Sequence, residues 1–155
     1  MRLWRISNHA SLSGDGGLYA SGRWHTRGRR VVYLADHPAS ALVEIMVHLE
    51  IDAEDLPTHY QLLGVEVPDG IAMVHIDETA LPEGWRGNVA LTRARGDTWL
   101  SENAAALLRV PSAIVPESAN YLLNPAHPDA ARIGIASAIR AAFDPRLMSQ
   151  SRPSS

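Results

Sequence analysis

The chain has 155 residues, enough for one domain with its own core, and its composition, 46% hydrophobic and 20% charged, is that of a globular protein. A formal net charge of -3 gives no electrostatic reason to wrap nucleic acid. All 14 basic residues are arginine and cysteine is absent, which excludes lysine Schiff bases, thiol nucleophiles, zinc-thiolate sites and disulfides.

The N-terminal third predicts two strands and a helix. "LWRI" (3–6) and "RVVYL" (30–34) have the apolar, β-branched composition of strands. The Gly- and Ser-rich loop "SLSGDGGLYASG" lies between them and leads to Arg23. "DHPASALVEIMVHLE" then predicts a helix with Pro38 in its first turn and Glu44 in its interior.

The rest of the chain predicts a mixture of strands and helices. "HYQLLGVEVP" and "GIAMVHI" read as two strands that could form a hairpin. A second helix is predicted from near Asp97 until Pro111 stops it, and "DAARIGIASAIRAAF" predicts a final helix. "SAIVP" and "NYLLNP" read as short strands between these helices. We expect one mixed α/β domain (1–148) with at least six short strands, and a disordered tail (149–155).

Targeting signals are missing from the sequence. The opening segment "MRLWRISNHASLSG" has no apolar core of signal-peptide length, and nowhere do the roughly 18 apolar residues of a membrane span run together. The absence of cysteine suits a reducing cytoplasm. We therefore expect a soluble, cytoplasmic protein with no membrane partner.

Glu44 is the first candidate for a functional residue. A carboxylate inside an apolar helix is unfavourable unless a partner or a function holds it there, and Val43 and Ile45 flank this one. The alternative is an exposed stripe that Glu44 shares with Ser40 and His48 at i, i+4 spacing. The pattern alone does not choose between these two interpretations.

Arg23 and Tyr33 are further candidates. An arginine after a Gly-rich loop can bind phosphate or carboxylate through two hydrogen bonds, and its alternative role is a surface salt bridge. Tyr33 alternates with Val32 and Leu34 along its strand, so we expect it to face the opposite layer from both. Its alternative role is packing.

Several other motifs carry little support. "TRGRR" could bind nucleic acid, but three arginines in one turn of an acidic protein are typical of a solvated hairpin end. "GDGG" lacks the GxGxxG spacing of a dinucleotide site, and the seven histidines show no HExxH motif. Glu44 and His48 could share a metal in principle. Ser112 has no GxSxG elbow around it, which argues against a hydrolase nucleophile.

Three blocks of sequence resemble one known family. Arg23, Glu44 and Ser112 resemble the Arg, Glu and Ser for which the RES domain is named, in the toxins of RES–Xre type II toxin–antitoxin pairs. The blocks are the opening "LWRIS", then "GRWH" before "VVYLADHPASALVE", then "VPSAIVP...NYLLNPAHPD", in the family's order. Ser118 is the competitor for the family serine, but Ser112 occupies the position that resembles the "PS" motif.

The resemblance implies an α+β fold similar to that of ADP-ribosyltransferases. Small, mostly antiparallel β-sheets flanked by helices would bind NAD+, as the substrate and without a metal, in a cleft between them. Glu44 would stabilise the cation that forms when nicotinamide leaves. Arg23 would hold the pyrophosphate or the neighbouring ribose, and Tyr33 would stack on the nicotinamide ring.

The remaining implied site residues bind or position NAD+. Ser112 would position it by hydrogen bonding, with no nucleophilic role. Arg5 and Asn120 are further NAD+-binding candidates on the same resemblance, with a structural role as the alternative for both.

The implied function is that of a growth-arresting toxin that cleaves NAD+ and transfers ADP-ribose to a target protein. With water or phosphate as the acceptor, the enzyme would be an NAD+ glycohydrolase or phosphorylase. Alternatives from other classes are an RNA-cleaving toxin and a non-catalytic binding toxin. The implied partner is an Xre-type helix-turn-helix antitoxin that covers the NAD+ cleft and contacts the operator, so this chain need not bind DNA directly.

Overall fold

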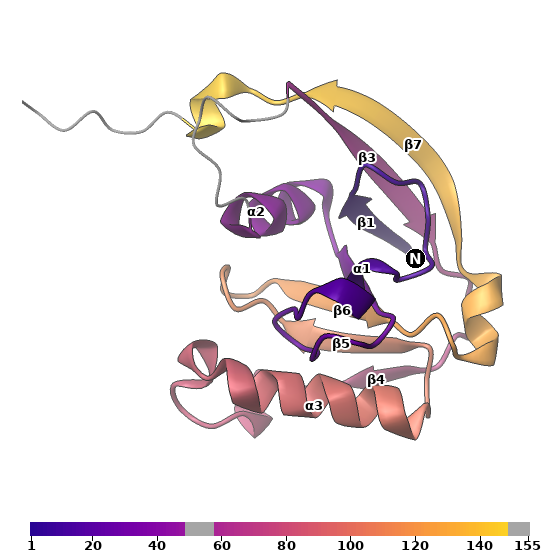
Figure 1. Cartoon of the computed structure of the whole chain (residues 1–155), viewed down its shortest axis with the longest axis vertical. Helices are drawn as coiled ribbons and strands as arrows, with labels where there is room; N and C mark the ends of the chain where they lie inside the picture. The colour runs from indigo at the N-terminus through magenta and orange to yellow at the C-terminus, as the bar shows by residue number, and fades with distance from the viewer. Residues whose placement is uncertain (49–57, 149–155) are drawn as a thin grey trace, which may run out of the picture.

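The computed structural model describes residues 1–48 and 58–148, apart from the side chains of His48 and Met148. Within these residues, the strands form one sheet in the order β4-β5-β6-β2-β1-β3-β7 (Figure 1). Neighbouring strands are antiparallel, except that β4 and β5 are parallel. The strands are β1 (Arg2–Ile6), β2 (Val32–Ala35), β3 (His59–Glu66), β4 (Met73–His75), β5 (Leu107–Pro111), β6 (Ala119–Leu123) and β7 (Gly134–Ala142).

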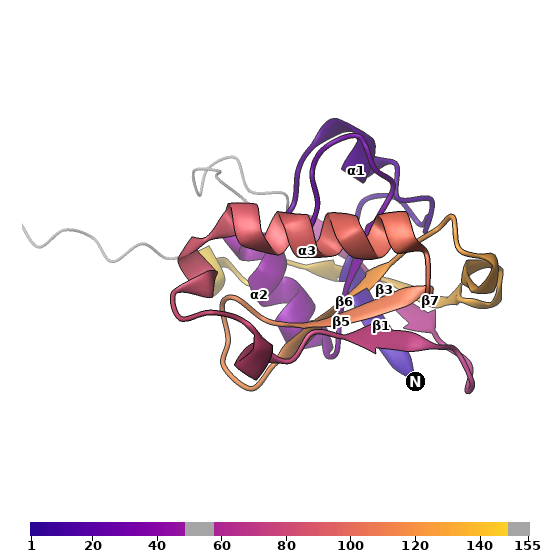
Figure 2. The same ribbon diagram turned by 90° about the horizontal axis from the view of Figure 1, so that it is seen from below.

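Two longer helices pack against different parts of the sheet. Figures 1 and 2 show α3 lying across β4, β5 and β6, whereas α2 packs against β1 and β2. The helices are α1 (Gly16–Tyr19), α2 (Pro38–His48) and α3 (Val89–Glu102), with the short 3-10 helices η2 (Glu78–Ala80), η3 (Trp85–Gly87), η4 (Pro128–Arg132) and η5 (Pro145–Met148). Of the helices in the described part of the chain, none has the length and apolar character that a membrane crossing requires.

Alternating side chains of the central strands fill two apolar clusters. One cluster joins the α3 residue Trp99 to Leu108 of β5 and includes Trp24 and Trp85. The other includes Val32 and Leu34 of β2. Tyr33 packs against the first cluster, so the prediction that it faces the opposite layer from its strand neighbours is confirmed.

The elements with strong local signals occur where the sequence predicts them. β1, β2, β6 and α2 are confirmed, and Pro38 is the first residue of α2. The predicted β3–β4 hairpin is wrong, because β3 pairs with β1 and β7 while β4 lies at the other edge of the sheet beside β5. Reciprocal hydrogen bonds between Met1 and Val67 keep the chain alongside β1 beyond the end of β3, and so prevent an immediate reversal.

The second predicted helix is displaced. α3 begins eight residues earlier than predicted, at Val89, where the Asn88 side chain accepts a hydrogen bond from Leu91 N. It ends at Glu102, and the C-cap residue Asn103, with a left-handed φ of 52°, terminates the helix. The apolar segment before Pro111 is predicted as helical, but it forms the mostly buried strand β5. A short apolar run fits a helix or a strand equally well, and here burial within the sheet selects the strand.

Two further predictions are wrong. "SAIVP" is a loop that closes through the hydrogen bond from Ser112 N to Ser118 O. The predicted final helix is instead η4 followed by the edge strand β7, which pairs with β3 along its length. Its alanines favour a helix locally, and only pairing with β3 overrides that preference. The predicted disordered tail, 149–155, lies outside the described residues.

Candidate active site

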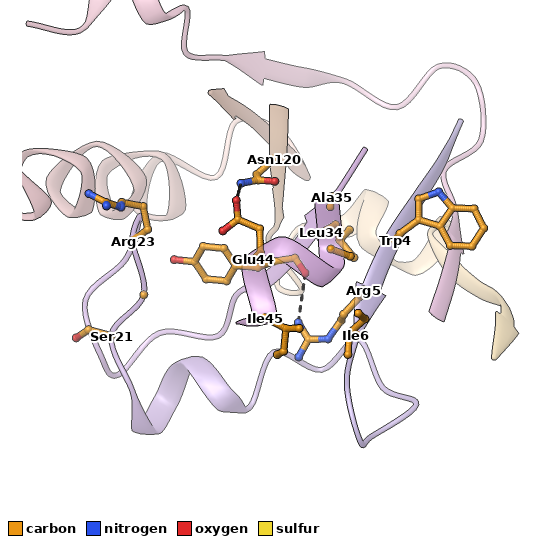
Figure 3. A pocket seen from close by; sticks show the side chains of 13 residues that line it. Trp4, Arg5, Ile6, Ser21, Arg23, Leu34, Ala35, Glu44, Ile45 and Asn120 are labelled. Atoms are coloured by element: carbon orange, nitrogen blue, oxygen red, sulfur yellow. Dashed lines mark hydrogen bonds between the residues drawn. The ribbon is translucent and has the colours of Figure 1, made fainter. Parts of the chain in front are cut away.

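A cavity of about 310 Å³ opens between β1, β2, α2 and the loop that follows α1. Side chains from all of these elements line it, together with Asn120 of β6 (Figure 3). Apolar side chains such as Trp4, Ile6 and Ile45 form much of its wall. Four polar candidates from the sequence, Arg5, Arg23, Glu44 and Asn120, meet here although they are far apart along the chain.

Glu44 projects from α2 into this cavity, and its carboxylate is held on one side. Oε1 accepts a hydrogen bond of 2.7 Å from Asn120 Nδ2 and one of 3.2 Å from Ser112 Oγ. No described residue donates a hydrogen bond to Oε2. The carboxylate is therefore fixed in orientation, with one oxygen available to a ligand. The partners of Glu44 are therefore Ser112 and Asn120 on other elements of the fold, rather than Ser40 in an exposed stripe on the same helix. The side chain of His48, which is considered for the same stripe, lies outside the described residues.

Ser112 reaches Glu44 from the loop after β5 and does not line the cavity. It is buried, and its Oγ also accepts hydrogen bonds from Ile114 N at 3.1 Å and Val115 N at 3.0 Å. Ser118 closes the same loop through its backbone carbonyl, which accepts from Ser112 N. The position of Ser112 suits it to orient the carboxylate.

Two arginines lie on either side of Glu44 in Figure 3. Arg23 Nη1 donates to Arg86 O at 2.7 Å, which ties the guanidinium to η3. Arg5 Nη1 donates a long hydrogen bond of 3.4 Å to Tyr33 O, while its Nε is buried without a partner in the described structure. Burial lowers the pKa of Arg5, but an arginine remains charged at any physiological pH.

The unpaired polar atoms in this cavity fit an anionic, hydroxyl-bearing ligand. Arg5 is a partly buried cation whose Nε lacks an acceptor, and an anion that paired with it would offset the cost of its burial. Asn120 Oδ1 is buried and unpaired as well among the described residues. Among the described residues, no group of three or more His, Cys, Asp or Glu side chains is placed to hold a metal ion.

Tyr33 lines the cavity, and its hydroxyl is engaged behind the cavity wall. Its Oη lies 2.7 Å from His25 Nδ1 and accepts a hydrogen bond from Trp24 N at 3.0 Å. Burial raises the pKa of Tyr33 above its ordinary value, so the hydroxyl stays protonated.

The arginine cluster "TRGRR" is largely paired within the chain. Arg29 Nε lies 3.8 Å from Asp97 Oδ1, and Arg30 Nε donates to Asp15 Oδ1 at 3.0 Å. These pairs leave less positive charge free for a polyanion than the sequence suggests.

The side chains that hold the Arg23 loop in place are not among the residues that the sequence pointed to. Thr92 Oγ1 of α3 donates to Arg23 O at 2.6 Å, and Arg93 Nε donates to Gly22 O at 2.8 Å. His25 is buried behind the same loop. The only sequence signal for these residues is that His25 lies two positions after Arg23 in "GRWH". Thr92 and Arg93 of α3 are some 70 residues away from the loop, so no local pattern points to them.

A model of the RES domain matches residues 2–144 of this chain. The chain belongs to the RES domain family. The family resemblance carried by the three sequence blocks is thereby confirmed, with a match that extends over nearly the whole of the predicted domain 1–148.

Curated relatives carry toxin names. "Toxin Res" of Pseudomonas putida is 52% identical over 130 residues, which cover 84% of this chain and 88% of that protein. "Prs ADP-ribosylating toxin" of Sphingobium sp. is 38% identical over 156 residues, covering 94% of this chain and 96% of the relative. This RES-family chain therefore spans nearly the full length of both relatives.

A solved structure supports the RES-family fold. The M. tuberculosis MbcT–MbcA toxin–antitoxin complex contains a chain with a TM-score of 0.71 and 18% sequence identity, over 95% of this chain and 86% of that one. At this identity the likeness concerns the fold alone. The expected single α+β domain is confirmed, with the difference that the described strands form one continuous sheet.

Proposed function

We propose that this RES-family chain is a toxin enzyme that binds NAD+ in the cavity, cleaves its nicotinamide–ribose bond and transfers ADP-ribose to a target protein. The observation that carries the proposal is the Glu44 carboxylate, which Asn120 and Ser112 hold in place in a cavity that two arginines also line. The Sphingobium relative named for ADP-ribosylation lends further support.

Glu44 acts on the ribose. When the bond between ribose C1′ and the nicotinamide nitrogen breaks, both electrons leave with nicotinamide, which departs as a neutral molecule. The sugar is left with the positive charge of an oxocarbenium ion, and a fixed carboxylate stabilises that charge more in the transition state than in bound NAD+. The free Oε2 also accepts a hydrogen bond from a ribose hydroxyl, which orients the sugar.

The other cavity residues bind the substrate. Arg5 and Arg23 pair with the pyrophosphate and its neighbouring ribose through charge-assisted hydrogen bonds. Tyr33 offers its ring to the nicotinamide, and Asn120 Oδ1 accepts from a ribose hydroxyl. Ser112 acts through Glu44, which it orients. The cavity volume of about 310 Å³ lies within the range of small-molecule sites and suits the nicotinamide half of NAD+.

The partner in this proposal is an antitoxin of the Xre type that covers the cavity mouth. The solved relative was crystallised as a toxin–antitoxin complex, which supports an antitoxin partner here. Addition of such an antitoxin to the active enzyme should abolish NAD+ turnover at a fixed stoichiometry.

The test is nicotinamide release from NAD+ by the purified chain, with and without cell extract, while the masses of intact proteins are followed. Release that needs extract and adds ADP-ribose to one protein supports the transferase. Release without extract makes the enzyme a glycohydrolase, or a phosphorylase if it requires phosphate. Glu44→Gln is nearly isosteric and should reduce release by about 10²- to 10³-fold. Unchanged release by this variant would refute the assignment of Glu44.

A further inference from the structure

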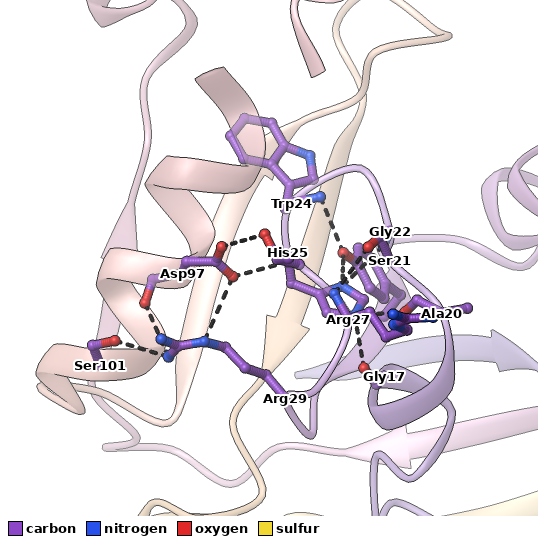
Figure 4. A network of polar contacts seen from close by, with 12 residues as sticks. Gly17, Ala20, Ser21, Gly22, Trp24, His25, Arg27, Arg29, Asp97 and Ser101 are labelled. Carbon is purple, nitrogen blue, oxygen red and sulfur yellow. Dashed lines mark hydrogen bonds and ion pairs between the residues drawn. The ribbon is translucent and has the colours of Figure 1, made fainter. Parts of the chain in front are cut away.

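The loop that carries Arg23 is held by the side chains of His25 and Tyr33. Figure 4 shows the polar contacts around His25, Gly22 and Trp24. The backbone N–H groups on both sides of Arg23 donate to this pair. Gly22 N donates to His25 Nδ1 at 3.2 Å and also to the backbone carbonyl of His25 at 3.1 Å, and Trp24 N donates to Tyr33 Oη at 3.0 Å. The two acceptors are themselves joined at 2.7 Å. The His25–Tyr33 pair therefore holds the backbone on both sides of Arg23.

The surroundings of His25 determine which ring nitrogen carries the proton. Nε2 lies 3.0 Å from Ala20 O and 3.3 Å from Gly17 O, and carbonyl oxygens can only accept. Nε2 is therefore the donor. Nδ1 is then unprotonated and accepts from both Gly22 N–H and the Tyr33 hydroxyl. His25 is only 2% exposed, so no solvent replaces these partners.

The packing leaves the loop little freedom to move away from this pair. A Cβ added to Gly22 would overlap Tyr33 Oη and lie 2.9 Å from His25 Nδ1. On the opposite side, Thr92 and Arg93 of α3 bind the carbonyls of Arg23 and Gly22. The loop is thus clamped between α3 and the His25–Tyr33 pair.

We propose that His25 is a positioning residue for NAD+ binding. As the neutral Nε2–H tautomer, it fixes the Tyr33 hydroxyl and, through it and Gly22, the backbone that presents Arg23 to the cavity. This inference rests on the proposed function. Because Asn120 and Ser112 hold Glu44 independently of this loop, the loss of the Nδ1 acceptor should raise KM for NAD+ and leave kcat nearly unchanged.

Two amide variants separate this role from a general contribution to stability. The amide of His25→Asn reaches the place of Nδ1 and retains an acceptor for Tyr33, but loses the bond to Ala20 O. The amide of His25→Gln reaches the place of Nε2 and retains that bond, but leaves the Tyr33 hydroxyl without its acceptor and Gly22 N with the backbone carbonyl of residue 25 alone. Each variant loses the hydrogen bonds on one side of the buried imidazole, so both should lower the melting temperature.

The experiment measures nicotinamide release against NAD+ concentration for the wild type and both variants, with melting temperatures recorded in parallel. We expect His25→Gln to raise KM by about tenfold with kcat within about threefold of the wild type, and His25→Asn to stay within about threefold in both constants. A folded His25→Gln protein with wild-type KM would overturn the proposal. So would equal KM changes in the two variants.

Tyr33→Phe provides a second, independent test of the proposal, which can be used if His25→Gln does not fold. It deletes the hydroxyl that joins the pair and should raise KM by a similar factor. In the Tyr33→Phe background His25→Gln should add less than about threefold, because both changes remove the same bond. A fully multiplicative effect, or an unchanged KM in Tyr33→Phe, would contradict the proposal. Failure of the wild type to release nicotinamide would instead refute the proposed function itself.

Discussion

Asn120→Ala removes the shorter of the two hydrogen bonds that hold Glu44. The bond from Nδ2 to Oε1 is 2.7 Å long and ends on a carboxylate, so it belongs to the stronger, charge-assisted class worth about 1.5–3 kcal/mol. At 1.4 kcal/mol per factor of ten, its loss should lower kcat/KM by roughly 10- to 150-fold. The longer bond of 3.2 Å from Ser112 remains, so the residual activity should stay measurable.

The stability effect of Asn120→Ala should be small by comparison. Asn120 is only partly buried, and its Oδ1 already lacks a partner, so its truncation removes an unsatisfied atom as well as a hydrogen bond. Initial rates of nicotinamide release would be measured together with the urea midpoint of unfolding. A kcat/KM within threefold of the wild type would refute the view that Asn120 orients the carboxylate.

Asn124→Ala provides the matched control. Asn124 follows β6, is 3% exposed, and donates to Asn103 Oδ1 at 2.8 Å, away from the cavity. Its truncation should lower the urea midpoint by more than Asn120→Ala does and leave kcat/KM near the wild-type value. Equal losses of activity in the two variants would indicate a general weakening of β6 rather than an effect on Glu44.

Three further predictions concern the loop, the buried arginine and the alkaline limit of stability. Gly96→Ala places a Cβ into the Trp24 carbonyl and should destabilise the fold by about 1–3 kcal/mol. For Gly87→Ala, no atom of the described residues beyond the chain neighbours lies within 4 Å of the new Cβ, so the free energy of unfolding should change by less than about 0.5 kcal/mol. Similar urea midpoints for the two variants would contradict this packing. Arg5→Met should preserve or raise the melting temperature, because it removes a partly buried charge with an unpaired Nε. The same change should raise KM for NAD+ by about tenfold, and a wild-type KM would exclude Arg5 from substrate binding. Burial raises the pKa of Tyr33 in the folded state, so the folded chain holds this proton more tightly than the unfolded one. The resulting stability is fully present below about pH 10 and is lost as the pH rises above it. The urea midpoint of Tyr33→Phe should therefore fall less steeply than that of the wild type above that pH, and parallel curves would count against the assigned burial effect.

The elements that the sequence predicts well are those with local signals. Pro38 and the apolar spacing after it specify α2, and the β-branched run around Val32 specifies β2. β7 illustrates the opposite case. Its alanine-rich sequence favours a helix over short range, and its strand conformation depends on β3, about 75 residues earlier in the chain.

The sequence by itself determined the family, the single mixed domain, the absence of thiol and lysine chemistry, and the position of Glu44 inside a helix. Those properties follow from composition, local periodicity and short motifs. The tertiary structure alone decided which groups meet that carboxylate, since Ser112 and Asn120 are 68 and 76 residues away from it. It also decided that His25 supports Tyr33 and that α3 holds the Arg23 loop. Such contacts depend on strand order and loop closure over long separations, and no local pattern encodes them.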